Sequence, residues 1–141
     1  MFNPNDFLVF SKNLLKKGGK RLNEALFRSI TSRTYYSAFL TAREQIDSIN
    51  PTLLIHSEGY RMHKQVVDTL NNPDFRFFQQ ERHLGGDLYE LQKWRIDADY
   101  HFPSACDSLE YCQRINPDTK MQALSSITYA EIIINQINNL G

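Results

Sequence analysis

Asparagine–proline pairs constrain the fold of this chain more than any other feature of its sequence. Four of the five prolines follow an asparagine: Asn3-Pro4, Asn50-Pro51, Asn72-Pro73 and Asn116-Pro117. Asn is a preferred N-cap residue, and Pro suits the first helical position because its missing N–H would have no intrahelical partner there. The pairs therefore indicate where helices begin or are separated. Because no alternating strand pattern competes with them, we predict an all-α fold.

Apolar residues that recur every three or four positions predict five main helices, in a compact up-and-down bundle that forms one domain over residues 1–141. We expect these helices at 4–17, 22–48, 60–70, 87–100 and 117–139. The longest should be the central one, with Tyr35, Tyr36 and Phe39 in the core and not on a base-stacking surface. Gly85-Gly86 should form a kink or a short loop. The inward side chains of the first helix should include Phe10, and those of the last should be Met121, Leu124, Ile127, Ala130, Ile134 and Ile137.

Composition narrows the function classes. Sixteen Lys and Arg balance sixteen Asp and Glu, which excludes a globally basic nucleic-acid binder but not a local basic patch. The densest basic cluster is Lys12, Lys16, Lys17, Lys20 and Arg21. It could follow a nucleic-acid backbone or simply be a solvated helix end.

Targeting and metal-binding signals are weak. Cys106 and Cys112 are too few for a disulfide framework, and His56 and His63 lack the usual spacing of paired helix ligands, so we expect no metal and no cofactor. The first residues do not resemble a signal peptide, and no apolar run approaches the roughly 18 residues of a membrane span. We therefore expect a cytoplasmic protein that does not cross a membrane.

Ionisable groups are concentrated between Leu91 and Pro103, at the end of the fourth expected helix. Arg95 and Asp99 are four residues apart and share one helix face, as do Asp97 and His101. Arg95 and His101 differ by roughly 120° around an ideal helix and by about 9 Å along it. They could meet at one phosphate only if the last turn unwinds or a two-fold partner supplies second copies. The alternative is that both acid–base pairs are ordinary surface pairs.

Three segments resemble the HEPN superfamily of small bacterial and archaeal helical proteins. Residues 28–43, RSITSRTYYSAFLTAR, are similar to the Arg-x-Tyr-Tyr-x-Ala-Phe-x-x-Ala-Arg helix of that family. Residues 91–100, LQKWRIDADY, resemble its Arg-x-x-Ala-Asp-Tyr segment, and HSEGY at 56–60 resembles its His-x-x-Gly turn. The segments occur in the same order as in that family, and the resemblance as a whole extends over about residues 5–140.

The resemblance implies a metal-independent endoribonuclease that acts as a homodimer, possibly a toxin or a defence nuclease. Its catalytic residues would be Arg95, which binds the phosphate, and His101, which transfers protons. The predicted orienting residues are Asp97, Asp99 and Tyr100, and the predicted substrate-binding residues are Lys93 and Arg33.

Two other functions stay open from the sequence. One is a non-catalytic HEPN module that binds nucleotide or a partner protein, such as a nucleotidyltransferase acting as antitoxin. The other is a structural bundle subunit that uses the extra apolar residues of its last helix for assembly.

Overall fold

Five helices contain most of the residues that this computed structural model describes, which are 3–18, 24–54, 60–72, 83–100 and 117–138. The helices are α1 (Asn5–Gly18), α2 (Glu24–Ile49), α3 (Tyr60–Asn71), α4 (Leu84–Tyr100) and α6 (Pro117–Asn138). No strand occurs within those ranges. The prediction of an all-α bundle is therefore confirmed, and each expected helix is found within about three residues of its predicted bounds.

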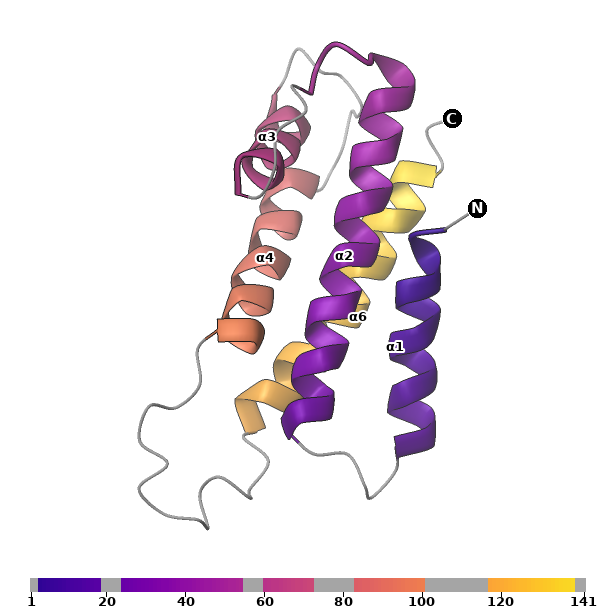
Figure 1. Cartoon of the computed structure of the whole chain (residues 1–141), viewed down its shortest axis with the longest axis vertical. Helices are drawn as coiled ribbons and strands as arrows, with labels where there is room; N and C mark the ends of the chain where they lie inside the picture. The colour runs from indigo at the N-terminus through magenta and orange to yellow at the C-terminus, as the bar shows by residue number, and fades with distance from the viewer. Residues whose placement is uncertain (1–2, 19–23, 55–59, 73–82, 101–116, 139–141) are drawn as a thin grey trace.

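Helix α2 lies at the centre of the bundle. It packs against α1, α4 and α6, and α3 lies beside α4 at one end (Figure 1). Helices α1 and α4 run in the opposite direction to α2 and α6, which gives the up-and-down arrangement. Most of the buried apolar side chains of α2 recur at helical spacing: Phe27, Ile30, Tyr35, Ala38, Phe39, Ala42 and Ile46. Because they occupy more than one face, α2 can bury surface against three neighbours at once.

The Asn-Pro pairs serve two purposes. The side-chain Oδ1 of Asn3 accepts a hydrogen bond from the backbone N–H of Asn5 at 3.0 Å, which caps α1, and α6 begins at Pro117. Asn50 instead ends α2 and forms a turn, with its Oδ1 accepting from the Thr52 N–H at 3.0 Å. Asn3 and Asn50 use the same local chemistry, because the side-chain oxygen of each accepts from the backbone N–H two residues ahead.

The predicted inward stripes of α1 and α6 are partly wrong. Phe10 is 50% exposed and Met121 is 60% exposed, while Leu124 is also open to solvent. The inward face of α6 instead includes Ala123 and Ile133, together with the predicted Ile127, Ala130, Ile134 and Ile137. Both expectations failed because the spacing of apolar residues does not show which of them a neighbouring helix covers, and exposed apolar residues are common on protein surfaces.

The two glycines at the start of α4 are helical, which contradicts the expected kink or short loop. Gly85 and Gly86 lie in the first turn of α4. Gly85 is buried, and a Cβ there would overlap the side-chain amide of Asn71 at the end of α3. The absence of a side chain therefore serves close packing of α3 against α4, and no special backbone conformation is needed.

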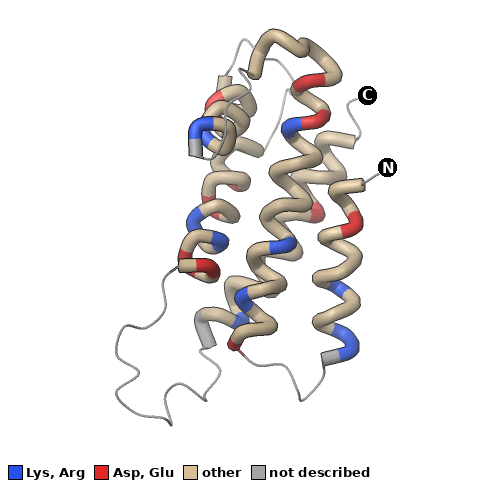
Figure 2. The backbone as a smooth tube through the Cα atoms, viewed as in Figure 1, with Lys and Arg blue, Asp and Glu red and all other residues tan. Residues whose placement is uncertain are grey.

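Basic residues gather along the C-terminal part of α1 and the first half of α2 (Figure 2). They are Lys12, Lys16 and Lys17 on α1 and Arg28 and Arg33 on α2. Lys12 pairs with Glu131 of α6, while the other members of the predicted cluster, Lys20 and Arg21, lie outside the described residues. The zero net charge therefore coexists with a concentration of basic residues at one end of α1 and α2, of which Arg28 is mostly buried. Of the helices described, none has the length and apolar character needed to cross a bilayer.

Candidate functional site

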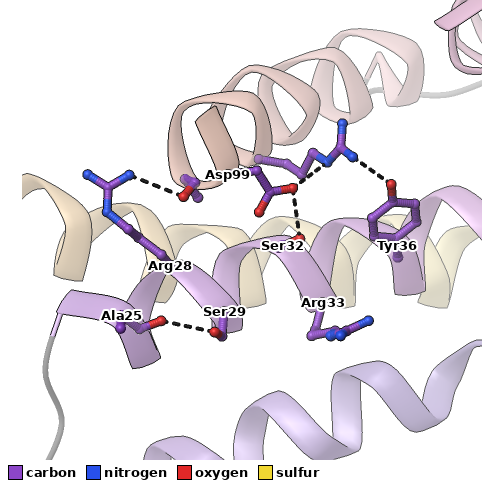
Figure 3. Close-up of a pocket in the computed structure, with 9 residues that line it drawn as sticks. Ala25, Arg28, Ser29, Ser32, Arg33, Tyr36 and Asp99 are labelled. Atoms are coloured by element: carbon purple, nitrogen blue, oxygen red, sulfur yellow. Dashed lines mark hydrogen bonds and ion pairs between the residues drawn. The ribbon is translucent and has the colours of Figure 1, made fainter. Parts of the chain in front are cut away.

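A depression of about 420 Å³ lies between α2 and the C-terminal half of α4 (Figure 3). Its lining is rich in cations and hydroxyl groups. The lining residues are Ala25, Arg28, Ser29, Ser32, Arg33, Tyr36, Arg95, Ala98 and Asp99. Three guanidinium groups and one carboxylate line this space, so its lining is electropositive. A concave, cationic surface of this kind suits an anionic ligand.

Helix α2 contributes to this site through a polar stripe. Glu24, Arg28, Ser32 and Tyr36 follow one another at steps of four residues, which places them on neighbouring turns of one face. The side chains of Arg28, Ser32 and Tyr36 each make a hydrogen bond to α4. The α2–α4 contact is thus polar along this edge, although α2 is apolar toward the core.

Arg95 is held tightly at the floor of the depression. Its Nε lies 2.9 Å from Asp99 Oδ2, and its Nη2 donates a 2.6 Å hydrogen bond to the Tyr36 hydroxyl. Its guanidinium also lies 5.1 Å from the ring centre of Tyr36 and 5.6 Å from that of Tyr100. With a side chain only 16% exposed, this guanidinium is preorganised and partly desolvated, which strengthens its attraction for an anion.

Asp99 links the two helices. Its Oδ2 accepts a 3.2 Å hydrogen bond from the Ser32 hydroxyl of α2 while it pairs with Arg95 of its own helix. The predicted pairing of Arg95 with Asp99 is therefore present. The same carboxylate oxygen therefore accepts the Ser32 hydrogen bond and forms an ion pair with Arg95 Nε, although this Nε makes no hydrogen bond among the described residues.

Arg28 closes the end of α4. Its Nη1 donates to the backbone carbonyls of Asp97 at 2.8 Å and Ala98 at 3.2 Å. Carbonyls in the last turn of a helix have no intrahelical donor and carry the negative end of the helix dipole, so a buried cation is well matched to them. Glu24 pairs with Arg28 and also accepts a 3.1 Å hydrogen bond from Thr119 of α6. The first turns of α2 and α6 are thereby tied to the last turn of α4.

Arg33 differs from the other two arginines of the lining. Its side chain is exposed, and its guanidinium lies 5.5 Å from the ring centre of Phe7 on α1. Figure 3 shows it extending along α2, away from Asp99. Within the described ranges, no carboxylate pairs with it. Arg33 is therefore the lining cation that solvent and ligands reach most easily.

A second polar pair lies deeper, next to Arg95. The hydroxyl of Tyr35, which is fully buried, hydrogen-bonds to Nδ1 of His63 from α3. The His63 ring stacks on Phe39, with 4.2 Å between ring centres. Burial, followed by the positive charges of Arg95 and Arg43, lowers the pKa of His63 below its usual 6.5. Burial also raises the pKa of Tyr35 above its usual range. Both shifts favour the neutral forms of the two groups that share this hydrogen bond.

The other predicted site residues occupy different positions. Lys93 is exposed, pairs with Glu90 at 2.8 Å and does not line the depression. Its hydrogen bond with Glu90 raises its pKa. Asp97 contributes its backbone carbonyl to Arg28. Tyr100 is 65% exposed with its ring against Arg95. His101 lies outside the described residues.

Sequence reasoning missed Arg28, Ser32 and Tyr36 as parts of this site. The polar spacing of four along α2 was the available signal, since such a stripe beside an apolar face predicts contact with a polar neighbour. It also missed the pairing of Tyr35 with His63, for which the sequence holds no local signal. Among the described residues, no three His, Cys, Asp or Glu side chains gather as metal ligands would; His56 and Cys112 lie outside those residues.

No protein-family model, curated protein or solved structure matches this chain. The resemblance to the HEPN superfamily therefore depends on the three quoted segments alone. Two of them, residues 28–43 and 91–100, are the helical segments that face each other across the depression.

Proposed function

We propose that this chain is a HEPN-type, metal-independent endoribonuclease that acts in the cytoplasm as a homodimer, with Arg95 and His101 as its catalytic residues. The observation that carries the proposal is the position of Arg95. It lines a cationic depression, its orientation is set by Asp99 and Tyr36, and His101 follows six residues later in the chain. An arginine fixed in this way suits a phosphate with developing negative charge.

The proposed reaction needs a general base, a general acid and a cation that binds the phosphate. His101 removes the proton from a ribose 2′-OH, and the 2′-oxygen attacks the adjacent phosphorus. The bond from phosphorus to the 5′-oxygen breaks, and a second imidazole, His101 of a two-fold partner, protonates that oxygen as it leaves. Arg95 neutralises the phosphate oxygens during the attack. The products are a 2′,3′-cyclic phosphate and a free 5′-hydroxyl.

An exposed stripe on α4 supports the homodimer. Exposed Tyr89, Lys93 and Tyr100 and half-buried Ile96 lie within about 60° of one another around the helix, at 100° per residue. Tyr89 and Tyr100 are 50% and 65% exposed, and tyrosine is enriched at interfaces. A two-fold contact along this stripe would bring two copies of the α4 end together. Sedimentation of the wild type and of Tyr89→Glu tests it: we expect a dimer that the substitution converts to monomer, and a wild-type monomer would count against this part of the proposal.

The decisive experiment is cleavage of mixed-sequence RNA in EDTA by the wild type, Arg95→Lys and His101→Ala. Arg95→Lys keeps the charge but loses the planar fork that binds two phosphate oxygens. We expect 2′,3′-cyclic ends from the wild type and at least about 100-fold slower cleavage by each variant, each confirmed to be folded. Equal cleavage by all three proteins, or none by the wild type, would refute the assignment. Growth arrest on expression that His101→Ala abolishes would support a toxin or defence role.

The contacts of Arg95 also favour a second function, a non-catalytic module that binds nucleotide or a partner protein. Asp99 and Tyr36 already engage this guanidinium, as in a purely structural link between helices. A nucleotidyltransferase is the partner that the HEPN resemblance suggests. Copurification with such an enzyme, together with the absence of cleavage, would favour this function over the first.

A further inference from the structure

We infer that the depression between α2 and α4 binds one backbone phosphate of single-stranded RNA, and that Asp99 occupies the place of this phosphate in the free protein. The choice of RNA rests on the proposed function. The exchange of a carboxylate for a phosphate rests on the contacts and charges of the described residues.

The contacts of Asp99 are those that a phosphate oxygen would make. Its Oδ2 lies 2.9 Å from Nε of Arg95 and accepts a 3.2 Å hydrogen bond from Ser32. Guanidinium and hydroxyl groups are the usual donors to phosphate oxygens in nucleic-acid complexes. Because the Asp99 side chain is only 28% exposed, a bound phosphate and the carboxylate would compete for the same donors.

The lining carries more positive charge than Asp99 neutralises, which favours the binding of a further anion. The lining holds three guanidinium groups, those of Arg28, Arg33 and Arg95, but only one carboxylate, and of the three only Arg95 pairs with Asp99. Glu24 is not part of the lining, but it pairs with Arg28 at 3.2 Å and so reduces the excess of positive charge. Arg33 remains the cation with no carboxylate partner among the described residues, and its exposed side chain can meet an entering phosphate first.

The size of the depression agrees with this ligand. About 420 Å³ falls at the small end of the range for ligand sites and exceeds what one phosphate group needs. The hydroxyls of Ser29 and Tyr36 lie in the same lining and can hydrogen-bond to a ribose. One nucleotide therefore fits, while the rest of a strand lies outside.

The exchange predicts opposite effects for two charge-changing substitutions. Asp99→Asn removes the competing charge and keeps the shape, so affinity for RNA should rise about tenfold, or about 1.4 kcal/mol. Arg33→Gln should lower affinity about tenfold and make the salt dependence shallower by about one charge. Asp68→Asn and Arg61→Gln are matched controls, because they make the same charge changes at exposed positions of α3. Ser32→Ala loosens Asp99 without any change of charge and should give a smaller rise in affinity.

The test is fluorescence anisotropy with a labelled single-stranded RNA that carries 2′-O-methyl groups throughout, so that no cleavage can occur. Each variant is first shown to be folded by its thermal transition. Opposite shifts for Asp99→Asn and Arg33→Gln, with small shifts for both controls, would support the exchange. Equal effects of Asp99→Asn and Asp68→Asn would overturn it, as would equal effects of Arg33→Gln and Arg61→Gln.

Two further comparisons distinguish a failure of the phosphate-site inference from a failure of the proposed function. Inorganic phosphate should displace this RNA only weakly. Full displacement, with the same gain in phosphate affinity for Asp99→Asn, would assign the site to free phosphate and overturn the choice of RNA. Binding in this assay does not need His101, so a failure of the cleavage experiment leaves the result interpretable. Conversely, intact cleavage with no effect at Asp99 or Arg33 would overturn only the inference on the phosphate site.

Discussion

The pairing of Tyr35 with His63 makes the stability of the fold depend on pH. In the folded protein, His63 is hydrogen-bonded to the Tyr35 hydroxyl, and burial together with Arg95 and Arg43 lowers the pKa of its imidazole, which favours the neutral form. The unfolded chain binds a proton near the usual pKa of 6.5. As pH falls below that value, the unfolded state therefore takes up more protons than the folded state. Linkage then requires the free energy of unfolding to decrease as the pH decreases.

The size of this effect follows from one differential proton. Between pH 6.5 and the lower folded pKa, the free energy of unfolding changes by at most about 1.4 kcal/mol per pH unit. With a urea m-value of about 2 kcal/mol/M, the unfolding midpoint should fall by about 0.7 M per pH unit. Above pH 6.5, this group should contribute no slope, because both states are then neutral.

Urea unfolding between about pH 8 and about pH 5 tests this reasoning in the wild type, His63→Gln and His83→Gln. Glutamine at position 63 retains an acceptor for Tyr35 but does not titrate. We expect His63→Gln to lose most of the slope below pH 6.5, whatever its stability at pH 8, and His83→Gln, at an exposed position, to parallel the wild type. Identical slopes for the wild type and His63→Gln would refute the argument.

Three further substitutions test other contacts by chemical denaturation. Arg28→Lys keeps the charge but cannot reach both α4 carbonyls and Glu24, so we expect a loss of about 2 kcal/mol; an unchanged midpoint would mean that these contacts add no stability. Gly86→Ala should add about 0.5–1 kcal/mol, because its Cβ meets only His83 Cβ at 3.7 Å; destabilisation would reveal a need for glycine. Ser126→Ala should add about 1 kcal/mol, because its buried hydroxyl has no hydrogen-bond partner among the described residues, and a loss of stability would contradict this.

Helical periodicity was enough to predict the fold class and the positions of the five helices. It predicted the burial of Tyr35 and Phe39, because apolar residues of a central helix repeat on the faces that it buries. It failed for Phe10, Met121 and Leu124, because periodicity shows only that apolar residues share a face and not whether a neighbour covers it. Periodicity also did not predict that Gly85 is helical. The need for glycine at this position comes from the Asn71 side chain of another helix, which leaves no room for a Cβ.

The candidate site was only partly predictable. The pairing of Arg95 with Asp99 followed from a spacing of four within one helix. The contacts of Arg28 with Asp97 and of Tyr36 with Arg95 join residues 69 and 59 positions apart, and no local pattern specifies such pairs. The roles of His101 and Lys93 in catalysis and substrate binding stay predictions, to be decided by the cleavage and binding experiments above.

The link between Glu24 and Thr119 also bears on the order in which the protein assembles during synthesis. The hydrogen bond from Ser11 to the Ile30 carbonyl joins residues 19 positions apart, so α1 and α2 can begin to pair while translation continues. The bond from Thr119 to Glu24 spans 95 positions and must wait until the start of α6 has left the ribosome. Until then, the first turn of α2 lacks one of its partners. We therefore expect nascent chains that end before α6 to expose the core face of α2 and to need a chaperone.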